Sequence, residues 1–197
     1  MIKTLLLVVS LSSPFAVADN GGHIQDLRGK VTLTRSGKSE PATKGAAFSS
    51  QDLIETGKNS SAFLQLEDGT QLKLGPGTRL TPLELKGDIE LKLESGSVIS
   101  KVTPRKPGQH FSMRTSSAVM GVRGTQFYTG YNENSVWMCV HEGEVEIENL
   151  ADHGKAQVPA GKGVKVQDGK MTPPEVVEWT KKINWGMKPD NEPSPWD

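Results

Sequence analysis

Cys139 and His141 are the two side chains whose types and spacing could support chemistry, two positions apart in VWMCVHEG. Because side chains two apart on a β-strand share a face, the thiol and the imidazole would be neighbours there. A cysteine beside a histidine is the arrangement of an activated nucleophile or of two metal ligands. The chain has no second cysteine to complete a metal site, and strand neighbours rarely reach nucleophile–base geometry. We expect a buried thiol and a tolerated imidazole.

The other titratable residues form no recognisable site. His23, His110 and His153 are far apart in the sequence and share no metal-ligand spacing. Neither glycine-rich piece, 75–77 or 121–125, leads into a helix, so neither is a phosphate-binding loop. The sequence therefore predicts a protein that is not an enzyme and that holds neither a cofactor nor a metal.

An arginine in the stretch AVMGVRGTQFYTG, residues 118–130, raises a different question. Apolar side chains up to Val122 share one parity along the strand, whereas Phe127 has the other. One extra residue between them would restore the alternation, so we expect a β-bulge with Gly124 at a positive φ. Arg123 would project beside this bulge, where its guanidinium could bond carbonyl groups or a carboxylate. We therefore favour a structural role for Arg123 over binding, and binding over catalysis.

Short alternating segments between glycine-rich turns make up most of the chain, a pattern typical of all-β domains. Two hairpins are clearest: residues 62–74, with Asp68-Gly69 as a two-residue turn, and residues 83–93, with Leu83 and Leu85 on one face. Related sequence pieces recur in each half. The expected fold is all-β, a sandwich or roll of short antiparallel strands in two similar halves, with further strands at 30–35, 111–115, 135–141, 144–148 and 163–166.

The sequence changes character after residue 171. Thr172 and Glu175 form a capping-box pattern, which predicts the start of a short C-terminal helix. Val176, Trp179 and Ile183 would share one face of it. We expect this helix to pack back on the sheets, with a helix offered to a partner as the alternative. The tail that follows it is expected to be mobile.

The N-terminus is expected to be a cleavable signal peptide. Lys3 precedes an apolar run that is too short to span a membrane, and Ala16-Val17-Ala18 fits a cleavage site after Ala18. The mature chain would begin at Asp19, without a lipid-anchored cysteine, and would be periplasmic or secreted. Without Lys3 the chain has 22 basic and 23 acidic residues, a net charge of −1. No basic block stands out, which argues against a nucleic-acid partner.

Several of these pieces together resemble the FecR domain family, which is named for a regulator of ferric citrate uptake. The resemblance rests on TSSAVMGVRGTQFYTG, VHEGEVEI and VPAGKGVKV in the second half, and on GKVTLTR, DLIETGKNSSAFLQLEDGTQLKLGPGTRL and LESGSVI in the first. It runs from Leu27 to Val166. Its most specific part is the motif formed by Val122, Arg123, Gly124 and Thr125, with Phe127 two residues further on.

The resemblance implies a periplasmic, mostly β domain that senses or relays a signal through protein contacts. In the founding type, this domain follows a cytoplasmic anti-sigma segment and one membrane helix, and it reads the state of a TonB-dependent outer-membrane receptor. Here a cleavable signal stands in place of both, so we expect a stand-alone exported member. The expected organisation is a signal peptide at 1–18, a mature N-terminal segment at 19–26, a FecR-like β domain at 27–168, and a C-terminal helix and mobile tail at 172–197.

The main functional expectation is a non-catalytic binding or adaptor module of the cell envelope, with envelope proteins as partners and no membrane-spanning segment. Two alternatives stay open. A peptidoglycan- or glycan-associated module would need surface aromatic residues, yet only Trp137 lies in the β body, because Trp179, Trp185 and Trp196 are in the tail. A hydrolase would use Cys139 and His141.

Overall fold

The computed structural model describes residues 21–187. The expected signal peptide with its cleavage site, and residues 188–197 of the expected tail, lie outside this described part. Its one helical element is the 3-10 helix η1 (Glu178–Lys182). Its strands are β1 (Gly22–Arg28), β2 (Val31–Arg35), β3 (Lys38–Pro41), β4 (Ala47–Phe48), β5 (Leu53–Thr56), β6 (Ser61–Leu66), β7 (Gln71–Leu74), β8 (Arg79–Glu84), β9 (Ile89–Lys101), β10 (Phe111–Arg114), β11 (Ala118–Val122), β12 (Gln126–Asn132), β13 (Ser135–Glu142), β14 (Glu144–Asn149), β15 (Lys155–Pro159), β16 (Gly163–Gln167) and β17 (Lys170–Met171).

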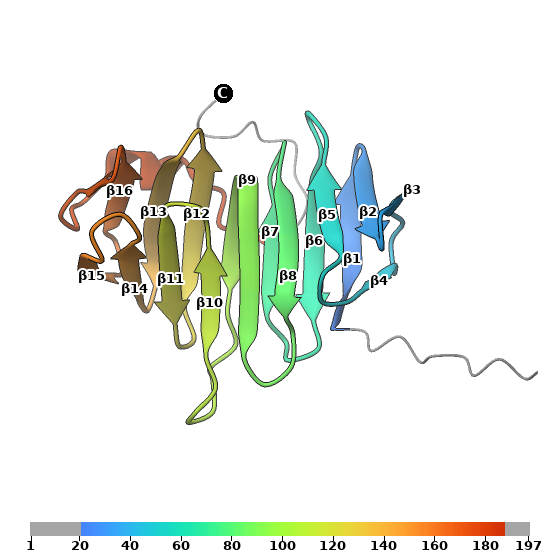
Figure 1. Cartoon of the computed structure of the whole chain (residues 1–197), viewed down its shortest axis with the longest axis horizontal. Helices are drawn as coiled ribbons and strands as arrows, with labels where there is room; N and C mark the ends of the chain where they lie inside the picture. Colours follow the sequence, from blue (N-terminus) through green and yellow to red (C-terminus); the bar gives the residue numbers. More distant parts are fainter. Residues whose placement is uncertain (1–20, 188–197) are drawn as a thin grey trace, which may run out of the picture.

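These strands form two layers, and the chain progresses from one end of both layers to the other (Figure 1). Sheet A has the order β4-β1-β6-β7-β9-β12-β13-β16-β17. Sheet B has the order β3-β2-β5-β8-β9-β10-β11-β14-β15. Neighbouring strands are antiparallel, except that β9 and β10 are parallel. The all-β fold predicted from the alternating pattern is confirmed.

Strand β9 belongs to both sheets. Residues 89–95 pair with β8 and β10 in sheet B, and residues 96–101 pair with β7 and β12 in sheet A. The strand changes layers at Gly96, whose φ is +85°. A Cβ atom there would lie 2.4 Å from the Cα of Thr78, so a side chain does not fit. The halves of the chain before and after β9 each contribute strands to both sheets.

The core lies between the two sheets, because each strand turns its apolar parity inward. In β14, Val145 and Ile147 are buried while Glu144 and Glu146 are exposed. Residues from both sheets join one continuous apolar cluster. Full burial of one Leu, Val or Phe side chain stabilises a fold by ~1.5–3 kcal/mol relative to exposure. Burial of the inward-facing apolar side chains therefore explains why the two sheets pack against each other.

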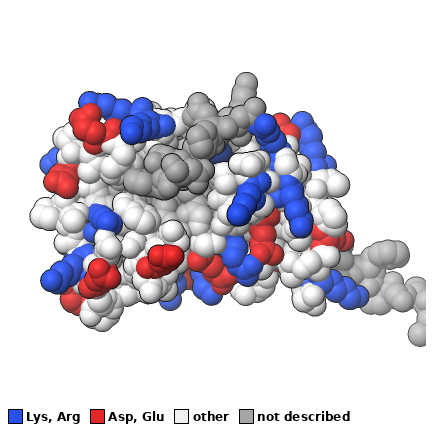
Figure 2. Space-filling model, turned by 90° about the horizontal axis from the view of Figure 1, so that it is seen from above, with Lys and Arg blue, Asp and Glu red and all other residues white. Residues whose placement is uncertain are grey.

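Charges of both signs lie on the surface around this core. On the face seen from above in Figure 2, acidic and basic side chains both occur across the described part of the molecule. This distribution agrees with the near-neutral composition of the chain.

The predictions for the two hairpins are wrong in detail. The hairpin of β6 and β7 closes through three residues, 67–69, because the Leu66 N–H already donates to the Thr70 carbonyl at 2.9 Å. In the second hairpin, a register shift between Pro82 and Glu84 interrupts the alternation of β8. As a result Leu83 is only partly buried, and it does not share the inward face with Leu85.

The capping box predicted at Thr172 is wrong, because the sheet already uses the backbone there. The Thr172 N–H donates to the Lys165 carbonyl at 2.9 Å, and the Thr172 hydroxyl accepts from the Lys165 N–H at 3.0 Å. Glu175 then forms an antiparallel bridge with Gly163. Residues 170–175 therefore run beside β16, and the expected helix is reduced to η1, which begins after Val177.

Residues 176–187, here called the C-terminal strap, lie across the outer face of sheet A. Ile183 is buried in a small cluster with Ile99, Tyr128 and Cys139, separate from the main core. Trp179 and Trp185 pack on the same cluster. The prediction that Trp179 and Ile183 of the expected C-terminal helix pack back on the sheets is confirmed.

Polar side chains of sheet A also hold the strap. The Lys73 ammonium donates to the carbonyls of Asn184 and Gly186, at 3.3 and 3.1 Å. The Gln126 amide donates to the Trp185 carbonyl at 3.0 Å. These bonds satisfy strap carbonyls that no regular secondary structure serves.

We predict that the strap controls access to the Cys139 thiol. Cys139 is fully buried and burial raises the pKa of its thiol, so a thiol reagent at about pH 8 should leave the native chain unlabelled. Ile183→Asp should detach the strap, because a carboxylate cannot stay in the apolar cluster, and Cys139 should then react within minutes. The reagent is an aromatic disulfide that releases a coloured thiolate each time it reacts with a protein thiol. The absorbance of this released product over time measures the labelling of Cys139.

Val176→Asp is the matched control, because Val176 lies in the same strap but is 70% exposed. It should leave Cys139 protected. Equal labelling of the two variants, or rapid labelling of the unchanged chain, would contradict the covering role of the strap.

Candidate functional site

The Val-Arg-Gly-Thr motif connects the two sheets. β11 ends at Val122 in sheet B and β12 begins at Gln126 in sheet A, so residues 123–125 cross between the layers. The inward direction reverses between facing sheets, which explains why Val122 and Phe127 are both buried despite their opposite parity. The predicted β-bulge is therefore wrong: one strand ends and another begins. The positive φ predicted for Gly124 is confirmed, at +74°.

Four of the five motif residues are used by the fold. Val122 is buried, and the Phe127 ring meets that of Phe111 edge-on, with centroids 6.2 Å apart. Gly124 passes so close to Pro104 that a Cβ atom would lie 3.0 Å from the proline Cα. The Thr125 hydroxyl donates to the carbonyl of Glu144 at 2.9 Å, which ties the crossing to β14. These contacts hold residues 123–125 in one path.

Arg123 is the exception within the motif. Its side chain is exposed, and it forms no hydrogen bond or ion pair within residues 21–187. The bonds to carbonyl groups or a carboxylate that we expected from the sequence are not made in this part of the chain. Because an exposed, solvated charge adds little to stability, the fold does not require this side chain. Arg123 is available to a ligand.

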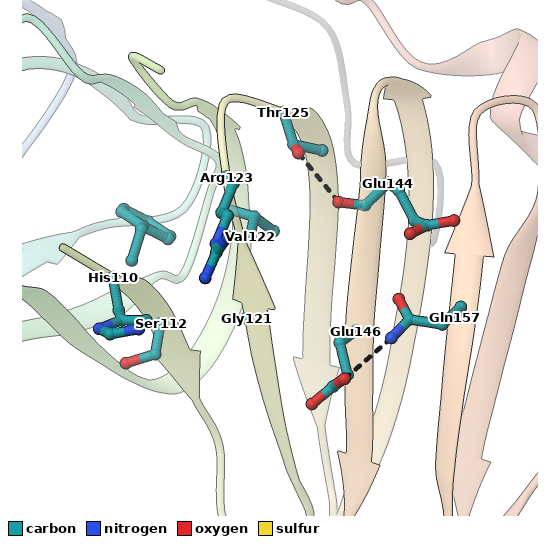
Figure 3. Close-up of a pocket in the computed structure, with 10 residues that line it drawn as sticks. His110, Ser112, Gly121, Val122, Arg123, Thr125, Glu144, Glu146 and Gln157 are labelled. Carbon is teal, nitrogen blue, oxygen red and sulfur yellow. Dashed lines mark hydrogen bonds between the residues drawn. The ribbon is translucent and has the colours of Figure 1, made fainter. Parts of the chain in front are cut away.

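The Arg123 side chain lines a groove on the outer face of sheet B (Figure 3). The groove has a volume of about 580 Å³ and is formed by β10, β11, β14 and β15. Cross-strand register places Ser112, Gly121, Glu146 and Gln157 in one row on its floor and wall. Gly121 has no side chain to fill the space above its strand. A Cβ atom built there would have no neighbouring atom within 4 Å, so the groove is open at this position.

The groove has opposite charges on its two sides. Figure 3 shows Arg123 extending on the side of β10, with Glu144 and Glu146 on the side of β15. The Glu146 carboxylate accepts a hydrogen bond from the Gln157 amide at 2.8 Å and lies 3.7 Å from the Lys155 ammonium. The Glu144 carboxylate has no such partner among the residues that the structure describes. One cation and one carboxylate therefore remain free.

Sequence reasoning found Arg123 but missed the rest of the groove. A signal was present at Gly121, which occupies the outward parity of its strand between Val119 and Arg123. A glycine in a strand interior often marks a place where another backbone or a ligand approaches closely. The acidic side follows only from the pairing of β11 with β14, which no local pattern specifies.

Cys139 and His141 share the outer face of β13, as predicted, but their surroundings do not activate the thiol. Burial raises the pKa of Cys139, which keeps the nucleophilic thiolate scarce. The His141 ring stacks on Trp185, with centroids 4.6 Å apart and ring planes 17° from parallel. The position therefore lacks the activated nucleophile that the hydrolase alternative needs.

The described tryptophans are engaged by other protein groups. Trp179 meets Tyr128 with ring centroids 5.9 Å apart, Trp185 stacks on His141, and the Lys165 ammonium lies 5.4 Å from the centre of the Trp137 ring. Among residues 21–187, no group of three His, Cys, Asp or Glu side chains could hold a metal ion. Over the same range, no helix has the length and apolar character needed to cross a bilayer.

Comparison with known proteins bears on the family resemblance. Residues 52–146 match the family described as "FecR protein", which confirms the resemblance seen in the sequence. The matched region contains all five motif residues and every groove residue except Gln157.

Solved structures share the fold. Two crystal structures of a "putative anti-sigma factor" from Parabacteroides distasonis ATCC 8503, at 2.50 and 1.65 Å resolution, each align with a TM-score of 0.55 and 21% sequence identity. Each alignment covers 61% of this chain and 57% of that chain. At this identity the likeness concerns the fold alone. No curated protein matches the chain in sequence.

We predict that Arg123 and Phe127 differ sharply in their contribution to stability. Arg123→Ala removes an exposed side chain and should change the unfolding free energy by no more than about 0.5 kcal/mol. Phe127→Ala opens a cavity in the core and should cost ~3–5 kcal/mol, which lowers the melting temperature by on the order of 10 °C. Thermal unfolding followed by circular dichroism measures both. A loss of several degrees in Arg123→Ala would restore the structural role expected from the sequence.

Proposed function

We propose that this chain is an exported, signal-sensing module of the cell envelope that acts by binding another protein. The observation that carries the proposal is the state of Arg123. It belongs to the most specific motif of the FecR domain, yet it is the motif residue that stays exposed and unpaired within the described residues. The guanidinium of Arg123 lies at the rim of a groove, on a segment whose path other contacts hold in place. Such a side chain is better placed to bind a ligand than to stabilise the fold.

Independent observations support the parts of this proposal. The FecR domain supports sensing through protein contacts, and the proteins that share the fold carry the name anti-sigma factor. Lys3, the apolar run after it and the Ala16-Val17-Ala18 pattern support export to the periplasm or beyond. The engaged tryptophans make a glycan-associated role the weaker candidate, because sugar stacking needs an exposed aromatic face.

We predict that position 123 lies at the partner interface. A photo-crosslinking phenylalanine analogue at Arg123, introduced in the native host, should yield a discrete adduct that mass spectrometry identifies as an envelope protein. The matched control replaces Lys38, which is also exposed but lies on β3, at the other end of sheet B. Irradiation of the control should give no such adduct.

Three results would count against the proposal. If positions 123 and 38 give the same adducts, or if neither gives any, then the groove is not a protein interface. If position 123 captures only cell-wall fragments, the glycan-associated role takes its place.

A further inference from the structure

We propose that the groove on sheet B binds an extended segment of the partner protein that carries one acidic and one basic side chain on the same face. This inference rests on the proposed function and adds the chemistry of what is bound. It follows from two properties of the groove, its separated charges and its uncovered floor.

The two free charges are neighbours that do not pair. Val122 lies opposite Val145 in the last pair of the antiparallel ladder of β11 and β14, so Arg123 directly follows this pair on one strand and Glu144 directly precedes it on the other. Both residues line the groove, so their charges lie on the same surface. No ion pair joins them, and Figure 3 shows the two side chains pointing apart.

A ligand gains most by serving both sides at once. An anionic group beside Arg123 would form charge-assisted hydrogen bonds with the guanidinium. A cationic group on the other side would meet Glu144 and also Glu146, whose carboxylate is only partly served by Gln157 and Lys155. A purely acidic ligand would be repelled by the carboxylates, and a purely basic one by the arginine.

The floor of the groove suits a main chain. Gly121 has no side chain and its Cβ position is open, while its register partner Ser112 has a short side chain. Strands lie about 4.8 Å apart, so four strands span roughly 14 Å, the length of about four extended residues. Side chains two positions apart on such a segment face the same way. An acidic and a basic residue at that spacing match the two free charges.

Capped pentapeptides test this chemistry directly. The probes are acetyl-Gly-Asp-Ser-Lys-Gly-amide and its counterparts with two aspartates or two lysines. The mature chain, labelled with ¹⁵N, is titrated and followed by two-dimensional NMR. We expect the mixed-charge peptide to shift the Gly121 and Ser112 amides, and to bind at least about tenfold more tightly than either counterpart.

Charge-reversed variants make the test specific. Arg123→Glu should switch the preference to the two-lysine peptide, and Glu144→Lys should shift it toward the two-aspartate peptide. Lys38→Glu on β3 makes the same change in net charge as Arg123→Glu and should leave the preference unaltered. All three positions are exposed, and thermal unfolding confirms that each variant is folded.

Each other outcome overturns the inference. It fails if no peptide shifts the groove amides, if all three bind equally, or if Arg123→Glu does not switch the preference. It also fails if soluble muropeptides shift these amides and the peptides do not. If position 123 still captures a protein in cells, the proposed function survives and only the ligand chemistry is wrong. Loss of both results removes both proposals.

Discussion

The hydrogen bonds of β9 are the constraint on which the rest of the structure depends. One covalent segment is an interior strand of both sheets, so the bend at Gly96 sets how the layers face each other. β10 pairs with the first part of β9, and β12 pairs with the second. The crossing at residues 123–125 therefore starts from β11, which is held through β10, and ends on a strand that is held by β9 directly. Strand pairing with β9 and β10 therefore fixes both ends of the crossing, apart from any contact within residues 123–125.

This arrangement separates the work of folding from that of recognition within one short motif. Gly124 against Pro104 and Thr125 on Glu144 fix the path of the chain. Arg123 is carried on that path without taking part in holding it. Because the main chain on either side is already ordered, a ligand at Arg123 pays chiefly for ordering one side chain. Gly121 contributes to the site because it has no side chain, which leaves space on the floor of the groove for a ligand.

Much of the fold could be predicted from alternation, because the buried and exposed parities of β10, β13 and β14 follow from their own residues. The change of layers at residues 123–125 could not, because a bulge and a change of sheet invert the parity in the same way. The prediction of a helix starting at Thr172 was wrong for a related reason. The backbone N–H and the hydroxyl of Thr172 form hydrogen bonds with Lys165 in β16, and the local capping-box pattern carries no information about this pairing. The acidic side of the groove depends on register, which only the assembled sheet defines.

The shared strand also limits where the chain can be divided. Strands β1–β8 alone would end in two unpaired edges, β7 in sheet A and β8 in sheet B, that β9 covers in the complete fold. Adding β9 moves the open edges to its other side, where β10 and β12 belong. Open edges of this kind are templates for strand addition between molecules. A product truncated between the halves would therefore self-associate rather than persist as a half-domain.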